Sequence, residues 1–338
     1  MMNMLPLGKL RPELLARLLK EVPVYDQRLI VGPGIGLDCA VVALEETCLV
    51  FKSDPITFVT DEIGWYAVQV NANDIATTGA TPRWFLATVL LPEGKATSED
   101  AEKISRQLYK ACASLEISVI GGHTEITYGI DRPIIAGTMI GEVPSQDLIT
   151  PQGASPGDHI LLTKGVPIEG TAILAREFSR QLAERCTLEE LQQARGYLYD
   201  PGISVVRDAR LAIQAGKVSA MHDPTEGGLA GALWELAEAC GHRLVINPEA
   251  VYIPALARKI CGYFRINPLE TIASGALLLT APAEDAIGIC DSLKGVGVNC
   301  AVIGIVESGP VQVLQSTRDE RAPLPRPERD EIARIFEG

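Results

Sequence analysis

The sequence contains no uninterrupted apolar run near the ~20 residues that a membrane-spanning helix requires. Its first residues, MMNMLPLGKLRPELL, also lack the long apolar core and the cleavage site of a secretory signal. Basic residues are few, with 30 Lys and Arg against 43 Asp and Glu, so the formal net charge is −13. We therefore expect no membrane span, and no nucleic-acid partner of the kind that a basic surface holds by its phosphates.

None of the eight cysteines forms a C-x-x-C pair, and most of them lie in apolar stretches. This pattern is typical of buried thiols in a reducing compartment, so we expect a cytoplasmic protein. The chain also has no Walker loop, no complete G-x-G-x-x-G and no G-x-S-x-G. Its chemistry must therefore come from some other arrangement of residues.

The length of 338 residues favours two domains. A Pro- and Gly-rich polar stretch at residues 144–157 predicts the boundary, which separates residues 1–150 from residues 151–338. Strand-like and helix-like patterns alternate on both sides of it, so the fold class is mixed α and β. We predict strands at 40–44, 48–51, 84–91, 117–120, 133–140, 159–163, 276–280 and 301–306, and helices at 14–19, 65–79, 98–115, 170–177, 203–215, 229–240 and 331–336.

A glycine-rich segment, Gly32-Pro-Gly34-Ile-Gly36-Leu-Asp38, comes before the first predicted strands. Closely spaced glycines let backbone N–H groups approach a phosphate, and a following carboxylate can hold Mg²⁺. Such loops are also common as plain turns, and taken alone this segment favours the turn.

Further acidic residues follow in the first half, at Asp54, at Asp61 and on the helix that carries Asn71, Asn73 and Asp74. Asn71 and Asp74 share a helix face because they are three residues apart. Asp74 has small and apolar neighbours, where an unpaired charge is costly. Local hydrogen bonding could satisfy it, but we favour a functional role such as metal binding.

Two more segments join glycines to polar residues. Gly121-Gly122-His123-Thr124-Glu125 follows a predicted strand and suits a turn that faces a ligand. The second, Asp223-Pro-Thr225-Glu-Gly227-Gly228, opens a predicted helix. There Thr225 or Asp223 is the expected cap, although a helix N-terminus can also bind an anion. Oxygen ligands without a Cys/His cluster favour Mg²⁺ over zinc.

These segments together resemble the superfamily of aminoimidazole ribonucleotide synthetase, which includes hydrogenase maturation factor E, thiamine-monophosphate kinase and selenophosphate synthetase. The most specific part is Val70-Asn-Ala-Asn73-Asp74-Ile-Ala-Thr-Thr-Gly79-Ala-Thr-Pro82, which is similar to the family's Val-Asn-Asp-x-x-x-x-Gly-Ala-x-Pro. The segments Asp61-Glu-Ile-Gly64, Asp223-Pro-Thr-Glu-Gly-Gly228 and Pro268-Leu-Glu-Thr-Ile-Ala-Ser-Gly275 also resemble family motifs in the same order.

The resemblance implies a two-domain α+β fold, in which the N-terminal β-sheet domain pairs across a homodimer into a barrel and the C-terminal domain is α/β. It implies ATP with Mg²⁺ as cofactors and an unknown small-molecule acceptor. On this basis the candidate metal ligands are Asp38, Asp54, Asp61, Asp74 and Glu125, and the candidate catalytic residues are Asp74 and His123. The candidate nucleotide contacts are Gly34, Gly36, Asn73, Gly121, Gly122, Thr124, Asp223, Thr225 and Gly227.

Three positions depart from the family pattern. His123 replaces an acidic residue, Glu226 replaces an arginine, and the chain ends in Arg334-Ile-Phe-Glu-Gly338 without the maturation factor's cysteine tail. We therefore expect an ATP-dependent phosphotransferase or ligase-type enzyme that does not perform the thiocarbamate chemistry. The alternative is a nucleotide-binding accessory protein, similar to the maturation factor, that has no turnover of its own.

Overall fold

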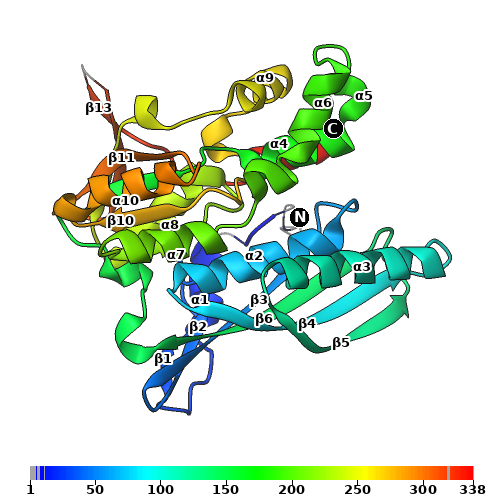
Figure 1. Cartoon of the computed structure of the whole chain (residues 1–338), viewed down its shortest axis with the longest axis horizontal. Helices are drawn as coiled ribbons and strands as arrows, with labels where there is room; N and C mark the ends of the chain where they lie inside the picture. The colour runs from blue at the N-terminus through cyan, green and yellow to red at the C-terminus, as the bar shows by residue number, and fades with distance from the viewer. Residues whose placement is uncertain (1–4, 6–7, 11, 318–319, 338) are drawn as a thin grey trace. The chain divides into compact units, whose positions relative to one another are not determined.

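A computed structural model describes residues 5, 8–10, 12–317 and 320–337 of the chain (Figure 1). The chain divides into two compact units. We call Val24–Gly32 with Asp38–Leu148 the small unit, and Met1–Pro23, Pro33–Leu37 and Ile149–Gly338 the large unit. This division differs from a single cut after residue 150 because two N-terminal segments group with the second half of the chain.

The small unit is built on a six-stranded sheet in the order β1-β2-β3-β6-β4-β5. Neighbouring strands are antiparallel, except that β4 and β5 run parallel. The predicted strands are present, and most are longer than the sequence pattern indicated. Their bounds are β1 Leu29–Val31, β2 Ala40–Leu44, β3 Thr47–Ile56, β4 Thr81–Pro92, β5 Ser118–Thr127 and β6 Ile134–Pro144.

Helices α2 (Ile63–Thr77) and α3 (Ser98–Ser114) lie over one face of this sheet, as Figure 1 shows. Every residue of α2 except Trp65 is buried, because the helix packs between the sheet and α3. Glycines in β6 allow this close packing, since a Cβ at Gly141 would lie 2.3 Å from a side-chain carbon of Ile75. The small unit therefore holds α2 rigidly against strands β3 and β6.

Residues 121–125 correct one prediction. They do not form a turn but lie within β5, where Gly121 to Glu125 pair with Leu86 to Leu90 of β4. Gly122 is required there, because a Cβ would come within 2.2 Å of the Ala87 carbonyl oxygen. The paired glycines thus serve close approach between two strands, and the polar residues after them lie on an exposed strand at the edge of the sheet.

The large unit contains a seven-stranded sheet in the order β13-β12-β9-β11-β7-β10-β8. Only β9 and β12 pair in parallel. The strands are β7 His159–Thr163, β8 Ala220–His222, β9 Arg243–Ile246, β10 Leu278–Ala281, β11 Cys300–Glu307, β12 Gln312–Ser316 and β13 Arg321–Pro323. The helices are α1 Pro12–Leu19, α4 Ile168–Glu177, α5 Ser179–Leu182, α6 Leu188–Gly196, α7 Val206–Ala215, α8 Gly228–Cys240, α9 Ala255–Phe264, α10 Ala283–Gly295 and α11 Glu331–Glu337.

The apolar stripe predicted for residues 229–240 is the core face of α8. Leu229, Leu233 and Leu236 are fully buried in one cluster with Leu278 of β10 and Ile303 of β11. Burial of such side chains is worth roughly 1.5–3 kcal/mol each, so this stripe anchors the helix to the sheet.

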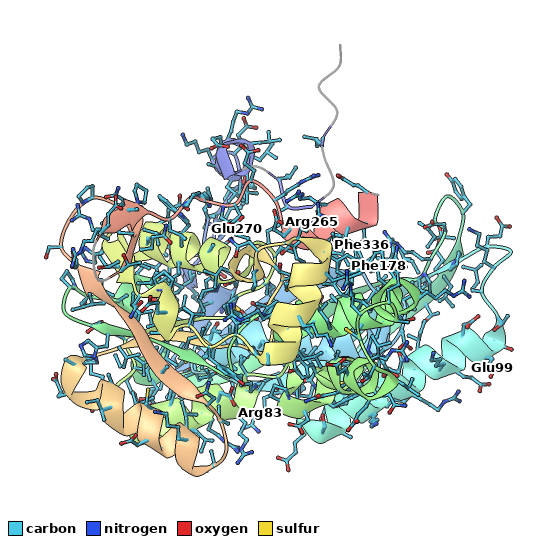
Figure 2. The ribbon with its side chains drawn as sticks, turned by 90° about the horizontal axis from the view of Figure 1, so that it is seen from above. Arg83, Glu99, Phe178, Arg265, Glu270 and Phe336 are labelled. Carbon is cyan, nitrogen blue, oxygen red and sulfur yellow. The ribbon has the colours of Figure 1, made fainter. Side chains whose placement is uncertain are left out.

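The C-terminal helix α11 is fixed to the same unit by an aromatic contact. The rings of Phe336 and Phe178 meet edge to face with centroids 5.1 Å apart, and Figure 2 shows both side by side. This contact helps to hold the segment just before α11, which includes Asp330.

Within the described residues, no helix is long and apolar enough to cross a membrane. All eight cysteines are free thiols, and all but Cys240 are buried. Burial raises the pKa of the Cys112 and Cys261 thiols to about 12, so these two groups stay protonated and unreactive at neutral pH.

Candidate functional site

The core-facing side of β3 carries two charged residues in its second half. Cys48 and Val50 are buried, and strand alternation puts Lys52 and Asp54 on the same side of the sheet. Helix α2 covers this side, so Lys52 lies beneath the helix that carries Asp74. The sequence pattern missed Lys52 because the predicted strand ended at Phe51, whereas β3 continues to Ile56.

Three carboxylates surround the Lys52 ammonium group. Lys52 Nζ lies 3.1 Å from Asp74 Oδ2, 3.7 Å from Asp54 Oδ2 and 4.0 Å from Asp38 Oδ1. We call these four residues the Lys52 cluster. The Asp74 side chain is 2% exposed and that of Lys52 is 13% exposed, whereas Asp38 and Asp54 are 25% and 38% exposed. The cluster therefore has a buried end at Asp74 and an accessible end at Asp54.

The backbone explains why residues from three segments meet here. Ala40 of β2 pairs with Phe51 of β3, so the residue just before β2, Asp38, lies beside the second half of β3. From α2, the Asn71 side-chain amide donates hydrogen bonds to the Ala67 carbonyl (2.8 Å) and the Asp54 carbonyl (3.3 Å). Asn71 thus connects the helix to the strand that carries Lys52 and Asp54.

The charges of the cluster stabilise one another. Burial by itself lowers the pKa of Lys52, but the carboxylates of Asp74, Asp38 and Asp54 outweigh it and hold the pKa well above the usual lysine value. One ammonium group against three carboxylates leaves a formal net charge of −2. The cluster therefore attracts further positive charge.

Other predicted metal ligands lie elsewhere in the small unit. Asp61, just before α2, is 3.5 Å from Lys103 of α3 in an exposed ion pair. On the edge strand β5, His123 Nε2 is 3.7 Å from Glu125 Oε2, and both side chains are more than half exposed. Thr124 is exposed on the same strand, whereas Asn73 is fully buried within α2.

The middle of the glycine-rich segment, residues 33–37, belongs to the large unit and forms a turn. Gly34 and Leu37 form an isolated β-bridge, and Gly36 has a positive φ of 70°. A Cβ at Gly36 would lie 2.7 Å from the Glu235 carbonyl oxygen of α8. Close packing against this helix therefore accounts for Gly36, as the turn interpretation of the segment expects.

The N-terminus of α8 differs from both alternatives that the sequence offered. Neither Thr225 nor Asp223 caps the helix. The cap residue is Gly227, which has no side chain that could accept a hydrogen bond. The Gly227 N–H instead donates to Asp330 Oδ2 at 2.6 Å. The Asp330 carboxylate thus occupies the position at the helix N-terminus that suits an anion. Sequence spacing could not indicate this contact, because Asp330 lies 103 residues from Gly227.

Asp330 and Glu169 are buried acids that lie near this helix end. Burial raises the pKa of each to about 7, although backbone N–H donors, such as Ile332 and Gly227 for Asp330, act in the opposite direction. The nearby Glu226 carboxylate raises both pKa values further. The exchange of the expected arginine for Glu226 therefore favours the protonated forms of these two acids.

Comparisons with known proteins cover most of the chain. The N-terminal domain of AIR synthase related proteins matches residues 36–143, and the C-terminal domain of the same proteins matches residues 155–316. A hydrogenase expression/formation protein of Methanocaldococcus jannaschii is 28% identical over 337 residues, which is 96% of each chain. The carbamoyl dehydratase HypE of Cupriavidus necator is 28% identical over 274 residues, or 78% of this chain and 73% of that protein.

The likeness extends to solved structures. The hydrogenase maturation protein HypE, in a crystal structure of its complex with ATP, superposes with a TM-score of 0.72 at 24% identity, covering 94% of this chain and 91% of that one. At this identity the likeness shows the fold. The chain belongs to the AIR synthase related proteins, and its two domains have their α+β fold.

Proposed function

We propose that the protein binds ATP together with Mg²⁺ at the Lys52 cluster and phosphorylates or otherwise activates a small-molecule acceptor. The observation that carries this proposal is the convergence of Asp38, Asp54 and Asp74 from three separate segments around one buried point. The similarity to HypE, which has been solved in complex with ATP, supports the same ligand.

The residues of the cluster fit Mg²⁺. Carboxylate oxygens are the hard ligands that Mg²⁺ prefers, and the formal charge of −2 favours a divalent cation. Asp54 and Asp38 would hold the ion at the accessible end. Asp61 and Glu125 lie outside the cluster and stay proposed metal ligands on the family resemblance alone. When bound, Mg²⁺ neutralises and orients the phosphates of the nucleotide.

The protein's own contribution is mainly positioning, as phosphoryl transfer generally requires. Asp74 acts by holding Lys52, and through it the geometry of the other two carboxylates. His123 offers Nε2 as a proton-transfer group on β5, beside Glu125. Thr124 and the backbone of Gly121 are exposed on the same strand as proposed nucleotide contacts. Gly227 is not available for phosphate while its N–H binds Asp330.

We also infer that the protein forms a homodimer through β5. Nine of the ten residues in this edge strand are exposed, including Val119, Ile120 and Ile126. A long exposed edge with apolar side chains readily pairs with another chain. A second copy would cover these three apolar side chains and could close the two sheets into the barrel that the family resemblance implies. Ile120→Lys should convert a dimer into a monomer in light scattering, and an unchanged mass would contradict this interface.

A second candidate function is an accessory role in hydrogenase maturation, with nucleotide binding but no turnover by this protein. The mutual 96% coverage with the Methanocaldococcus jannaschii hydrogenase expression/formation protein favours it. The two functions differ in product formation. An accessory protein would bind ATP in calorimetry but release no ADP or AMP with any acceptor.

Product formation tests the proposal directly. We would incubate the purified protein with ATP, Mg²⁺ and a metabolite extract and measure ADP and AMP. Asp74→Asn should abolish product formation, because it removes the charge that holds Lys52 in place. Asp147→Asn changes an exposed aspartate of the same unit and should have no effect. Full turnover by Asp74→Asn would contradict the assignment.

A further inference from the structure

Lys52 is a cation built into the proposed metal and nucleotide site. Its ammonium group lies within 4.0 Å of three carboxylates that come from the segment before β2, from β3 and from α2. Its side chain lies on the core-facing side of β3, so the ammonium group cannot move out to another position on the protein surface. The positive charge is therefore a fixed part of the site.

The buried end of the cluster shows what this charge does in the free protein. Asp74 is 2% exposed, and a carboxylate so far from water needs a compensating charge. Lys52 supplies it at the shortest distance in the cluster, 3.1 Å. The charge that compensates Asp74 is thus part of the chain itself and is present without a bound metal ion or nucleotide.

The accessible end of the cluster is affected as well. A divalent ion that binds Asp54 and Asp38 must approach the same ammonium group, because Lys52 Nζ is 3.7 Å and 4.0 Å from their oxygens. Like charges at such distances repel, and the partly buried setting weakens screening by water and salt. Lys52 thus lowers the affinity of these carboxylates for a free divalent ion.

We propose that Lys52 is a resident cation that competes with Mg²⁺ for the carboxylates of the cluster, so that the metal binds tightly only together with the negatively charged nucleotide. The triphosphate adds negative charge, which offsets the repulsion from Lys52. This role rests on the proposed function, since it concerns the same site. Lys52 acts here as a positioning residue that also sets the order of loading.

The test measures Mn²⁺ binding to the full-length protein by calorimetry without nucleotide. Lys52→Met should bind Mn²⁺ about tenfold more tightly than the unchanged protein, or better, because a nearby like charge is removed. Lys52→Arg keeps the charge and should bind as weakly as the unchanged protein. Lys95→Met removes an exposed lysine of the same unit and should change nothing. Equal Mn²⁺ affinities of Lys52→Met and the unchanged protein would overturn the proposal.

Thermal unfolding provides a second readout. Lys52→Met should melt at a lower temperature than the unchanged protein in chelator and recover when Mg²⁺ is added, whereas the unchanged protein should respond little to Mg²⁺. If Lys52→Met does not fold, Mn²⁺ binding to the unchanged protein without nucleotide still tests the proposal. Tight binding would overturn it, and weak binding supports it. Failure of the proposed function is a separate result, namely no binding of an ATP analogue even with Mg²⁺ present.

Discussion

Asp74 of the small unit and the pair Asp330 and Glu169 of the large unit are all buried acids, but their burial is compensated in different ways. In the small unit, Asp74 is paired with a lysine, whose pKa is held well above its usual value by the surrounding carboxylates. In the large unit, Asp330 and Glu169 are buried beside backbone N–H donors, and burial raises the pKa of each to about 7.

The contrast shows which group of acids is suited to binding a cation. The Lys52 cluster keeps two partly exposed carboxylates, those of Asp38 and Asp54, so it can accept a metal. Asp330 already accepts hydrogen bonds from Gly227 and Ile332, and Glu169 accepts one from Ser274. We interpret these two acids as structural groups that accept hydrogen bonds from backbone N–H groups.

The largest expected effect tests the pairing in the small unit. Lys52→Ala leaves Asp74 buried without its cation, and loss of one partner of a buried ion pair costs about 3–5 kcal/mol. Hydrogen exchange of the α2 amides in metal-free buffer would measure this loss of stability. Lys95→Ala is the matched control on the surface. Unchanged protection of α2 would show that Lys52 does not hold Asp74.

The next effect tests the backbone ligands in the large unit. Asp330→Ala removes the acceptor of the Gly227 and Ile332 N–H groups, which should cost about 1–3 kcal/mol. Asp330→Asn keeps one acceptor oxygen and should cost less. Hydrogen exchange of the α8 amides measures the change. Equal protection in the unchanged protein, Asp330→Ala and Asp330→Asn would mean that the Asp330 contact does not stabilise the helix.

A pH series sharpens the comparison. The pKa of Glu169 in the folded protein is about 7, above its ordinary value of 4.5, so its contribution to stability is complete below about pH 4.5 and is lost as the pH rises to about 7. The loss is at most about 1.4 kcal/mol per pH unit for one group. Glu169→Gln should flatten the fall of the melting temperature between these pH values, and an unchanged slope would contradict the raised pKa.

The smallest effect concerns the surface. Asp61 and Lys103 form an exposed ion pair, which should contribute less than about 1 kcal/mol. Lys103→Ala should therefore change the melting temperature slightly, and the change should disappear at high salt. A large or salt-independent effect would mean that Asp61 and Lys103 belong with the buried charges.

The sequence predicted the features that depend on local pattern. Helix α2 and its Asp74 followed from spacing and from the family resemblance. The helix predicted at 98–115 is α3, and a capping box between Thr97 and Asp100 explains its start. Of the five carboxylates predicted as metal ligands, Asp38, Asp54 and Asp74 meet around one point, whereas Asp61 and Glu125 do not join them. Lys52 at the centre was not predicted, because its place in the core-facing row appears only when β3 is seen to continue past Phe51.

Other features depended on contacts between distant parts of the chain. Asp330 meets Gly227 across 103 residues, and no local pattern indicates that pair. The glycines at 121 and 122 suggested a turn, because a glycine pair does not reveal that a neighbouring strand approaches closely. Local propensity therefore predicted the elements well, whereas tertiary packing determined which residues they bring together.

The most direct measurement is calorimetric binding of a non-hydrolysable ATP analogue with Mg²⁺ to the unchanged protein and to Asp38→Asn, Asp54→Asn and Asp74→Asn. If the three carboxylates form one site, each single substitution weakens binding, whereas Asp147→Asn binds as the unchanged protein does. Undiminished affinity in all three variants would contradict the account.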